Sequence, residues 1–221
     1  MHRTARQLRG LVTDWGGVLT TGLQDSLAAW AESDGVDWDH YLQAMRDLLG
    51  PDAVTQARVN PVHALERGEI EVPHFEQLLA ARLRRHDGAP VEPDGLLARM
   101  FTAFEHAEDM YRVVRRARRQ GLRTALLSNS WGNAYPVHLW DGLFDAVVIS
   151  GEVGLRKPEP EIYRLAAERL RLAPEECVFV DDLTVNVQGA VAVGMVGVRH
   201  TSYHETRAEL EALFGVPLGA G

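Results

Sequence analysis

Five short apolar runs, separated by turn residues and helical patterns, restrict the fold of this sequence more than any other feature. Each run has the length of a buried strand, and the runs cover residues 11–13, 124–127, 146–149, 178–180 and 195–198. Apolar residues at helical spacing occupy residues 108–120 and 160–171. Strands that alternate with helices form a parallel sheet with right-handed crossovers. The sequence therefore predicts an α/β fold with a doubly wound, Rossmann-like parallel sheet.

Residues 23–103 interrupt this alternation, because they contain no convincing strand. Several helical pieces are predicted there, with breaks at Gly35, Gly50-Pro51, Pro61, Pro73 and residues 88–93. A chain of 221 residues has room for one large core and a modest insertion. A helical block after the first strand is expected to cover the strand ends, where open α/β sheets bind ligands. We therefore predict an α/β core of residues 1–20 and 104–221, with a helical cap at residues 21–103.

The composition and the apolar runs of the sequence exclude some classes of binding partner and indicate where in the cell the protein is located. The chain has 31 acidic and 23 basic residues, a formal net charge of -8, which has the wrong sign for binding a nucleic-acid backbone. No apolar run approaches the ~18 residues of a membrane span or follows the N-terminal arginines as in a signal peptide. Cys177 is the only cysteine and lies in an apolar run, so a structural thiol is expected. We expect a cytoplasmic monomer or homodimer, with neither nucleic-acid nor membrane partners.

The first apolar run ends at Asp14, which is followed by Trp15 and the pair Gly16-Gly17. A strand that ends in a carboxylate holds it at the sheet edge, and small residues let backbone groups approach a ligand closely. Asp14 could attack a substrate or bind a metal. A turn-capping aspartate explains this segment equally well.

Two further segments of the sequence carry polar or charged side chains that could bind a phosphate group. Ser128 and Asn129 follow residues 124–127, where a hydroxyl and backbone N–H groups could hold a phosphoryl oxygen. Helix capping is the favoured explanation of that segment taken alone. Lys157 precedes a proline-rich turn, which could direct its ammonium toward a phosphate or toward carboxylates. A solvated surface lysine is an equal alternative.

The fourth cluster is the pair Asp181-Asp182, directly after residues 178–180. Adjacent carboxylates at a strand end repel each other, and a hard cation such as magnesium relieves that repulsion. A helix N-cap explains one of the two acids but not both. Asn186 lies one helical turn beyond Asp182, so it could orient a metal ligand or a metal-bound water.

These four clusters, in this order, resemble the motifs of the haloacid dehalogenase-like hydrolase superfamily over nearly the whole chain. The family also places a helical cap after its first motif. Within the cap, residues 65–70 and Phe75 are similar to the cap segment of small-sugar phosphatases, especially of the bacterial glucose-1-phosphate phosphatase type. The resemblance implies a hydrolase of small phosphate monoesters, such as a sugar phosphate, with a small phosphorylated metabolite as its substrate.

The resemblance also implies a role for each residue. Asp14 would attack phosphorus and form an aspartyl-phosphate, which water then hydrolyses. Magnesium (Mg2+) is expected between Asp14, the Gly16 carbonyl oxygen, Asp182 and the phosphate. Asp181 and Asn186 would support the ion through direct or indirect contacts. The phosphate would contact Lys157, Ser128, Asn129 and Gly17.

The sequence departs from the family at Gly16, where many family phosphatases have a second aspartate that protonates the leaving group. A positioned proton donor typically raises the reaction rate by about 10²- to 10⁴-fold. Without it, we expect slow turnover, a substrate with a good leaving group, or a substitute acid. Asp34, His63 and Glu66 of the cap are candidates for that acid.

Two other functions are also compatible with the sequence. A 2-haloacid dehalogenase needs neither a metal nor a proton donor, but Asp181 and Asp182 would then lie beside Asp14 without a cation. A catalytically weak phosphate-binding or regulatory homologue also accommodates Gly16, because a fold does not fix a function. Trp15 and Trp131 are equally suited to line the pocket or to pack under the cap.

Overall fold

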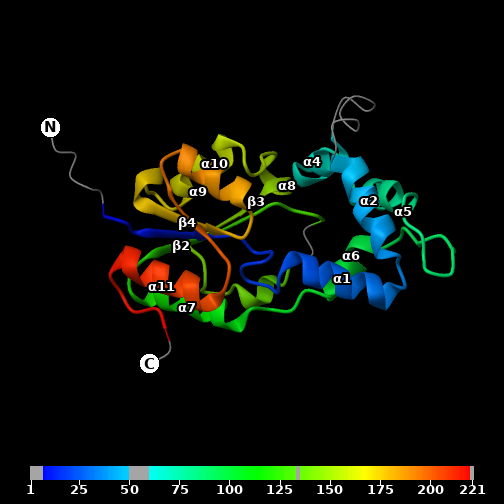
Figure 1. Ribbon diagram of the computed structural model, residues 1–221. Coiled ribbons are helices and arrows are strands. Elements are labelled where there is room, and N and C mark those ends of the chain that lie inside the picture. Colours follow the sequence, from blue (N-terminus) through cyan, green and yellow to red (C-terminus); the bar gives the residue numbers. More distant parts are fainter. Residues whose placement is uncertain (1–6, 50–59, 133–134, 220–221) are drawn as a thin grey trace.

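A computed structural model describes residues 7–49, 60–132 and 135–219 of the chain. A sheet of five parallel strands, in the order β3-β2-β1-β4-β5, lies between two layers of helices (Figure 1). The strands are β1 (Gly10–Thr13), β2 (Arg123–Ser128), β3 (Ala146–Ile149), β4 (Cys177–Asp181) and β5 (Val196–Arg199). All five predicted strands and the predicted doubly wound α/β fold are confirmed.

The strand β1 lies at the centre of the sheet and pairs with β2 on one side and β4 on the other. Its last residue, Thr13, is in register with Leu126 and Val180. Every residue of β1 and β4 is buried, because helices cover both faces of the sheet. The polar residues that follow these strands therefore emerge at one edge of the sheet, beside each other.

Adjacent residues of β1 belong to opposite layers. Leu11 belongs to the apolar cluster that includes Val113 of α7 (Glu108–Arg119) and Leu210 of α11 (Tyr203–Phe214). Val12 belongs to the cluster on the other face, with Ile162 of α9 (Pro160–Arg169) and Ala190 of α10 (Thr184–Ala192). Three short elements complete the core: η1 (Val137–Leu139), α8 (Ser150–Val153) and η2 (Pro174–Glu176).

The segment after β1 is helical, as predicted, and lies beyond the carboxyl ends of the strands (Figure 1). Its elements are α1 (Leu23–Asp34), α2 (Trp38–Leu49), α4 (Pro61–Glu66), α5 (Val72–Ala80) and α6 (Leu96–Thr102). They pack around an apolar cluster of their own, which contains Trp30, Phe75 and Leu79. We call this segment the cap. Its exact boundaries stay a prediction, and the predicted break at Gly50-Pro51 lies outside the described residues.

Two paired segments connect the cap to the core. The N–H of Thr21 donates to the carbonyl of Glu105 at 2.8 Å, and the N–H of Ala107 donates to the carbonyl of Leu19 at 2.9 Å. The chain therefore enters and leaves the cap through neighbouring strand-like connections, which hold the cap above the sheet edge.

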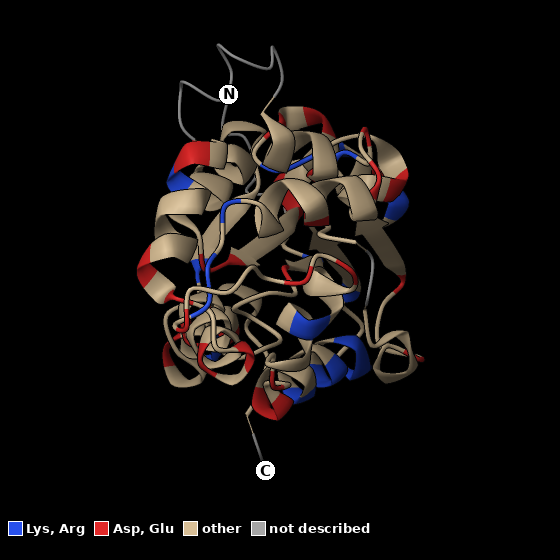
Figure 2. Cartoon of the chain, turned by 90° about the vertical axis from the view of Figure 1, so that its right-hand side faces the viewer, with Lys and Arg blue, Asp and Glu red and all other residues tan. Residues whose placement is uncertain are grey.

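Acidic and basic residues are interspersed over the end of the molecule in Figure 2, with a group of basic residues near its lower end. The helix α7 carries Arg116, Arg118 and Arg119 in its last turn, where cations interact favourably with the helix dipole. Arg118 also pairs with Asp145 at 2.8 Å. In the described parts of the chain, no helix is long and apolar enough to cross a membrane.

Candidate active site

The polar residues predicted to form a site do meet at one edge of the sheet. A pocket of about 420 Å³ lies there, lined by residues of the core and of the cap. Its lining includes Asp14 after β1, Ser128 at the end of β2, Lys157 before α9 and Asp182 after β4. Gly16, Asn129 and Asn186 also line the pocket, whereas Asp181 and Gly17 lie behind its surface.

Lys157 is the most deeply buried cation of the site, with 1 % of its side chain exposed. Its Nζ lies 2.8 Å from Oδ1 of Asp14 and 2.7 Å from Oδ2 of Asp181. Burial lowers the pKa of Lys157, but the two carboxylates outweigh burial and hold that pKa above its ordinary value. Lys157 is the only lysine in the sequence, and its compact ammonium bridges the two carboxylates.

The Asn129 side chain fixes the backbone of Lys157. Its Oδ1 accepts a hydrogen bond from the Lys157 N–H at 2.8 Å, and its Nδ2 donates to the Lys157 carbonyl at 3.1 Å. This two-way bond joins the end of β2 to the loop before α9. The sequence suggested only a backbone contact from Asn129 to phosphate, so this positioning role is new.

Asp181 is fully buried and uses both of its oxygens within the protein. Oδ1 accepts from the Leu183 N–H at 2.8 Å, Oδ2 accepts from Lys157, and the Asn186 amide lies 3.1 Å from both oxygens. Asp181 therefore holds Lys157 and Asn186 in place from behind the pocket.

Asp182 faces the pocket and packs against Gly17. A Cβ on Gly17 would lie 2.3 Å from Oδ2 of Asp182, and Gly17 has a φ of 71°, so only glycine suits this position. The Gly17 N–H donates to Oγ1 of Thr20 at 3.0 Å, within the turn and not toward the pocket. Burial raises the pKa of Asp182 to about 6, the charge of Asp181 adds to this rise, and Lys157 opposes it.

The three aspartates form one cluster, since one oxygen of each of Asp14, Asp181 and Asp182 lies within 4.8 Å of the others. Burial raises the pKa of Asp14 well above its ordinary value, although the Lys157 ammonium opposes this rise. A single ammonium leaves the cluster with excess negative charge when all three carboxylates are ionised. Hard oxygen donors with excess negative charge suit a divalent cation such as magnesium.

Ser128 has a partner that the sequence gave no reason to expect. The hydroxyl of Tyr135 lies 2.9 Å from Oγ of Ser128, and the Tyr135 ring packs edge-on against Trp15 with centroids 5.1 Å apart. Burial raises the pKa of Tyr135, so its O–H stays protonated and can donate to Ser128. The Ser128 O–H is then left to donate into the pocket.

Residues 8–194 match the family described as haloacid dehalogenase-like hydrolase. The chain belongs to this family. The predicted superfamily and the prediction of a hydrolase are thereby confirmed.

The chain is 28% identical to mouse acyl-CoA dehydrogenase family member 10, over its whole length but only 20% of that protein. It therefore spans about a fifth of this relative. The chain is 34% identical to the sesquiterpene phosphatase astK of Aspergillus oryzae, over 68% of the chain and 77% of the relative. It is also 32% identical to the glyceraldehyde 3-phosphate phosphatase of Methanopyrus kandleri, over 61% of the chain and 60% of the relative.

Solved structures of the family share this fold. A haloacid dehalogenase (HAD) family enzyme of Bacteroides thetaiotaomicron, in complex with magnesium and inorganic phosphate, has a TM-score of 0.60 at 19% identity, over 88% of this chain and 94% of its own. A dehalogenase with an intermediate complex has a TM-score of 0.65 at 19% identity, over 95% and 98% of the two chains. At such identities the likeness concerns the fold alone.

The haloacid dehalogenase-like site has open space at Gly16. A Cβ built on Gly16 meets no atom within 4 Å, and Gly16 lines the pocket. Of the three suggested substitute acids, only Glu66 lines the pocket, and it forms an ion pair with Arg156. Asp34 pairs instead with an arginine of the cap, and His63 does not line the pocket.

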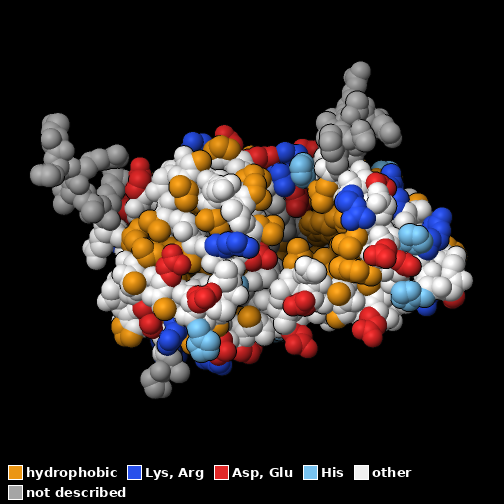
Figure 3. All heavy atoms as spheres, viewed as in Figure 1, with side chains coloured by type: hydrophobic (Ala, Val, Ile, Leu, Met, Phe, Trp, Pro, Cys, Tyr) orange, Lys and Arg blue, Asp and Glu red, His pale blue; other side chains and the backbone are white. Residues whose placement is uncertain are grey.

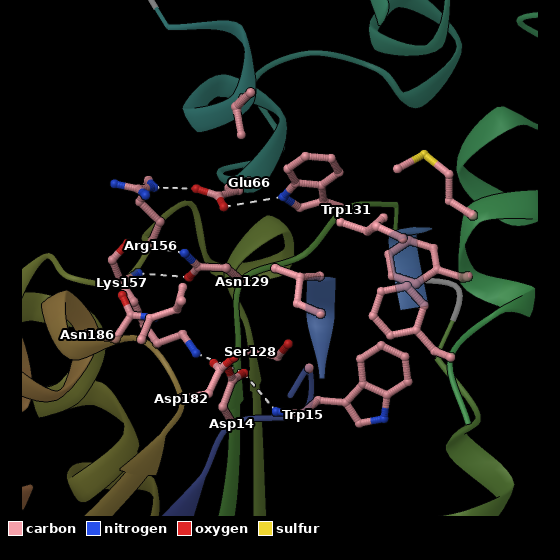
Figure 4. A pocket seen from close by; sticks show the side chains of 18 of the residues that line it. Asp14, Trp15, Glu66, Ser128, Asn129, Trp131, Arg156, Lys157, Asp182 and Asn186 are labelled. Carbon is pink, nitrogen blue, oxygen red and sulfur yellow. Dashed lines mark hydrogen bonds and ion pairs between the residues drawn. The ribbon is translucent and has the colours of Figure 1, made fainter. Parts of the chain in front are cut away.

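Glu66 belongs to a polar contact between cap and core that the sequence did not reveal. Its Oε2 pairs with Arg156, and its Oε1 accepts from Nε1 of Trp131 at 3.3 Å (Figure 4). Arg67 of the cap also pairs with Glu159 of the core. These contacts join segments about 65 to 92 positions apart in the sequence, and they hold α4 over the pocket.

Replacement of the buried cation tests the electrostatics of the site. Without added metal, Lys157→Met is expected to lower the free energy of unfolding at pH 7.5 by about 3 kcal/mol, because buried carboxylates lose their only ammonium. The loss should shrink at pH 5, where these carboxyls can bind protons. Urea unfolding at both pH values measures it. The exposed Arg164→Met serves as control, with a change below about 0.5 kcal/mol; an equal loss for Lys157→Met at both pH values would contradict this account.

Proposed function

We propose that this protein is a magnesium-dependent hydrolase of small phosphate monoesters that works through an aspartyl-phosphate on Asp14. The observation that carries the proposal is the pocket floor, where Asp14 and Asp182 lie beside one buried lysine and the Ser128 hydroxyl. The residues that would hold the ion are Asp14, Asp182 and the Gly16 carbonyl, with Asp181 and Asn186 supporting them. When bound, magnesium would neutralise charge on the phosphoryl oxygens.

Asp14 is held in a way that suits a nucleophile. Its Oδ1 accepts from Lys157 at 2.8 Å and from the Trp15 N–H at 2.7 Å, while Oδ2 has no donor among the described residues. Oδ2 is therefore free to form the bond to phosphorus as the ester oxygen leaves with its bonding electrons and takes a proton from water. Water then attacks the phosphorus and releases Asp14.

Three donors would surround the transferred phosphoryl group. Lys157 uses two of its three N–H groups on carboxylates, which leaves one for a phosphoryl oxygen. The Ser128 hydroxyl and the Asn129 N–H would bind the other oxygens. Because their supports are rigid, these donors need little rearrangement as negative charge develops in the transition state.

The comparisons support a phosphatase more than a dehalogenase. Two relatives above 30% identity are phosphatases by name, and they act on a sesquiterpene and on glyceraldehyde 3-phosphate by those names. Asp182 beside Asp14 also suits a metal, which a dehalogenase does not need. A weak phosphate-binding homologue is the remaining alternative. We propose a cytoplasmic location and a small phosphorylated metabolite as the substrate, in a monomer or homodimer.

Hydrolysis of 4-nitrophenyl phosphate tests the proposal. Release of nitrophenol should require magnesium, and Asp14→Asn should lower kcat by at least about 10³-fold, since it removes the nucleophile. The exposed Asp141→Asn is the matched control and should keep full activity. Halide release from 2-haloacids without metal would indicate a dehalogenase, and the absence of both reactions would indicate a binding protein.

Magnesium binding should depend on pH through Asp182. Its pKa of about 6, against an ordinary 3.8, means that the folded protein binds this proton more tightly than the unfolded chain. Without metal, stability therefore falls as pH rises through this interval, and magnesium must displace the proton. At pH 7.5, saturating magnesium should raise Tm by about 5–10 °C, and at pH 5 by at least ~3 °C less. Thermal unfolding measures both, and Asp182→Asn should reduce the difference, because Asp14, whose pKa burial also raises, accounts for the rest.

The open space at Gly16 predicts a gain of activity. Gly16→Asp should place a carboxyl beside Asp14, because a Cβ built on Gly16 meets no atom within 4 Å. If it protonates the leaving oxygen, kcat for an alkyl phosphate should rise by about 10²-fold, whereas 4-nitrophenyl phosphate, whose leaving group needs no proton, should change little. Gly16→Ala provides the control for added volume. Equal effects of the two substitutions on both substrates would contradict this prediction.

A further inference from the structure

The pocket is polar at its floor and apolar over most of its other walls. In Figure 4 the labelled polar groups gather on one side, and carbon side chains fill the opposite side. The apolar wall includes Leu27, Met45, Val62, Met100, Phe101 and Phe104. A volume of about 420 Å³ lies within the range of small-molecule sites, so the pocket can hold more than a phosphate group.

The cap contributes only two polar side chains to this pocket, Tyr41 and Glu66, within its described part. Both oxygens of Glu66 are already bonded, to Arg156 and to Trp131. Tyr41 is 3% exposed and its ring packs against Trp30 and Trp38. A sugar buried here would leave several hydroxyls without partners, and a buried polar group without a hydrogen bond is destabilising. The cap wall therefore disfavours a polyhydroxylated substrate.

The apolar surface continues to the mouth of the pocket. Six large hydrophobic side chains are exposed in the described chain, and four of them line this pocket: Leu23, Leu49, Leu183 and Val185, with 40% to 54% exposed. The first two belong to the cap and the last two to the core. Figure 3 shows hydrophobic side chains around the hollow between the two parts. An exposed apolar patch that is continuous with a catalytic pocket is typical of a ligand-binding surface.

We propose that the substrate is a phosphate monoester whose organic group is an apolar hydrocarbon, which packs between the cap wall and Val185 while the phosphate reaches Asp14. This inference rests on the proposed function and specifies its substrate class. A sugar phosphate, which the sequence suggested, lacks the apolar surface that this pocket would bury. Burial of about 0.8 kcal/mol per methylene would contribute most of the specificity.

A series of 4-alkylphenyl phosphates, from phenyl to 4-butylphenyl, tests this inference. The leaving phenol hardly changes along the series, so differences in kcat/KM report the burial of the alkyl group. We expect kcat/KM to rise about fourfold per carbon. The compound 4-(glucosyloxy)phenyl phosphate carries a sugar on the same leaving group and should react more slowly than 4-butylphenyl phosphate. A flat series, or faster reaction of the sugar compound, overturns the inference.

Two valines of the helix α10 give a matched pair of variants. Val185 and Val191 are 54% and 53% exposed, but only Val185 lines the pocket. Val185→Gln should reduce the ratio of 4-butylphenyl to phenyl phosphate kcat/KM by about threefold, whereas Val191→Gln should leave it unchanged. Equal effects of the two substitutions overturn the inference, because they would show that Val185 does not contact the substrate.

The experiments distinguish a failure of the apolar-substrate inference from a failure of the proposed phosphatase function. Magnesium-dependent hydrolysis of phenyl phosphate with a flat alkyl series preserves the proposed function and overturns the inference. If no ester is hydrolysed, the proposed function fails. Binding of 4-butylphenylphosphonate and phenylphosphonate to the magnesium-loaded protein, measured by calorimetry, then decides the ligand class: a preference of about 30-fold or more supports the apolar site, and equal affinities overturn it.

Discussion

The site depends on one buried interaction, in which the ammonium of Lys157 joins Asp14 after β1 to Asp181 at the end of β4. Burying charges is costly unless each has partners, and here Asn129 fixes the lysine backbone while Asn186 satisfies Asp181. The lysine still leaves negative charge in excess, because Asp182 adds a third carboxylate to the cluster. In the proposed function, the same arrangement orients the nucleophile and provides a place for a divalent cation.

Much of the fold follows from local patterns in the sequence. Strands that are buried on both faces have sequences that are short apolar runs, so they can be predicted. Parallel strands bring their carboxyl ends to one edge of the sheet, so the sequence alone predicts that Asp14, Ser128 and Asp182 lie close together. The contacts of Asn129 with Lys157 and of Tyr135 with Ser128 could not be predicted from the sequence. They depend on how loops fold back over the sheet edge, and neither residue type carries a signal for such a partner.

The core and the cap divide the chemistry between them. The core residues carry the charges and donors that a phosphoryl group needs, whereas the cap presents mainly apolar side chains to the same pocket. The carboxylate of Glu66 pairs with Arg156 across the boundary, and this ion pair holds the cap in position. Gly16 leaves open space at the position where many family phosphatases are expected to carry a proton donor.

Location of a bound metal ion tests the central claim most directly. Crystals soaked with Mn2+, which substitutes for magnesium and scatters anomalously, should show one anomalous peak between the carboxylates of Asp14 and Asp182. Lys157 should remain bonded to Asp181 in that structure. A peak elsewhere, or no peak at millimolar Mn2+ with intact protein, would contradict the account of a metal-assisted aspartate nucleophile.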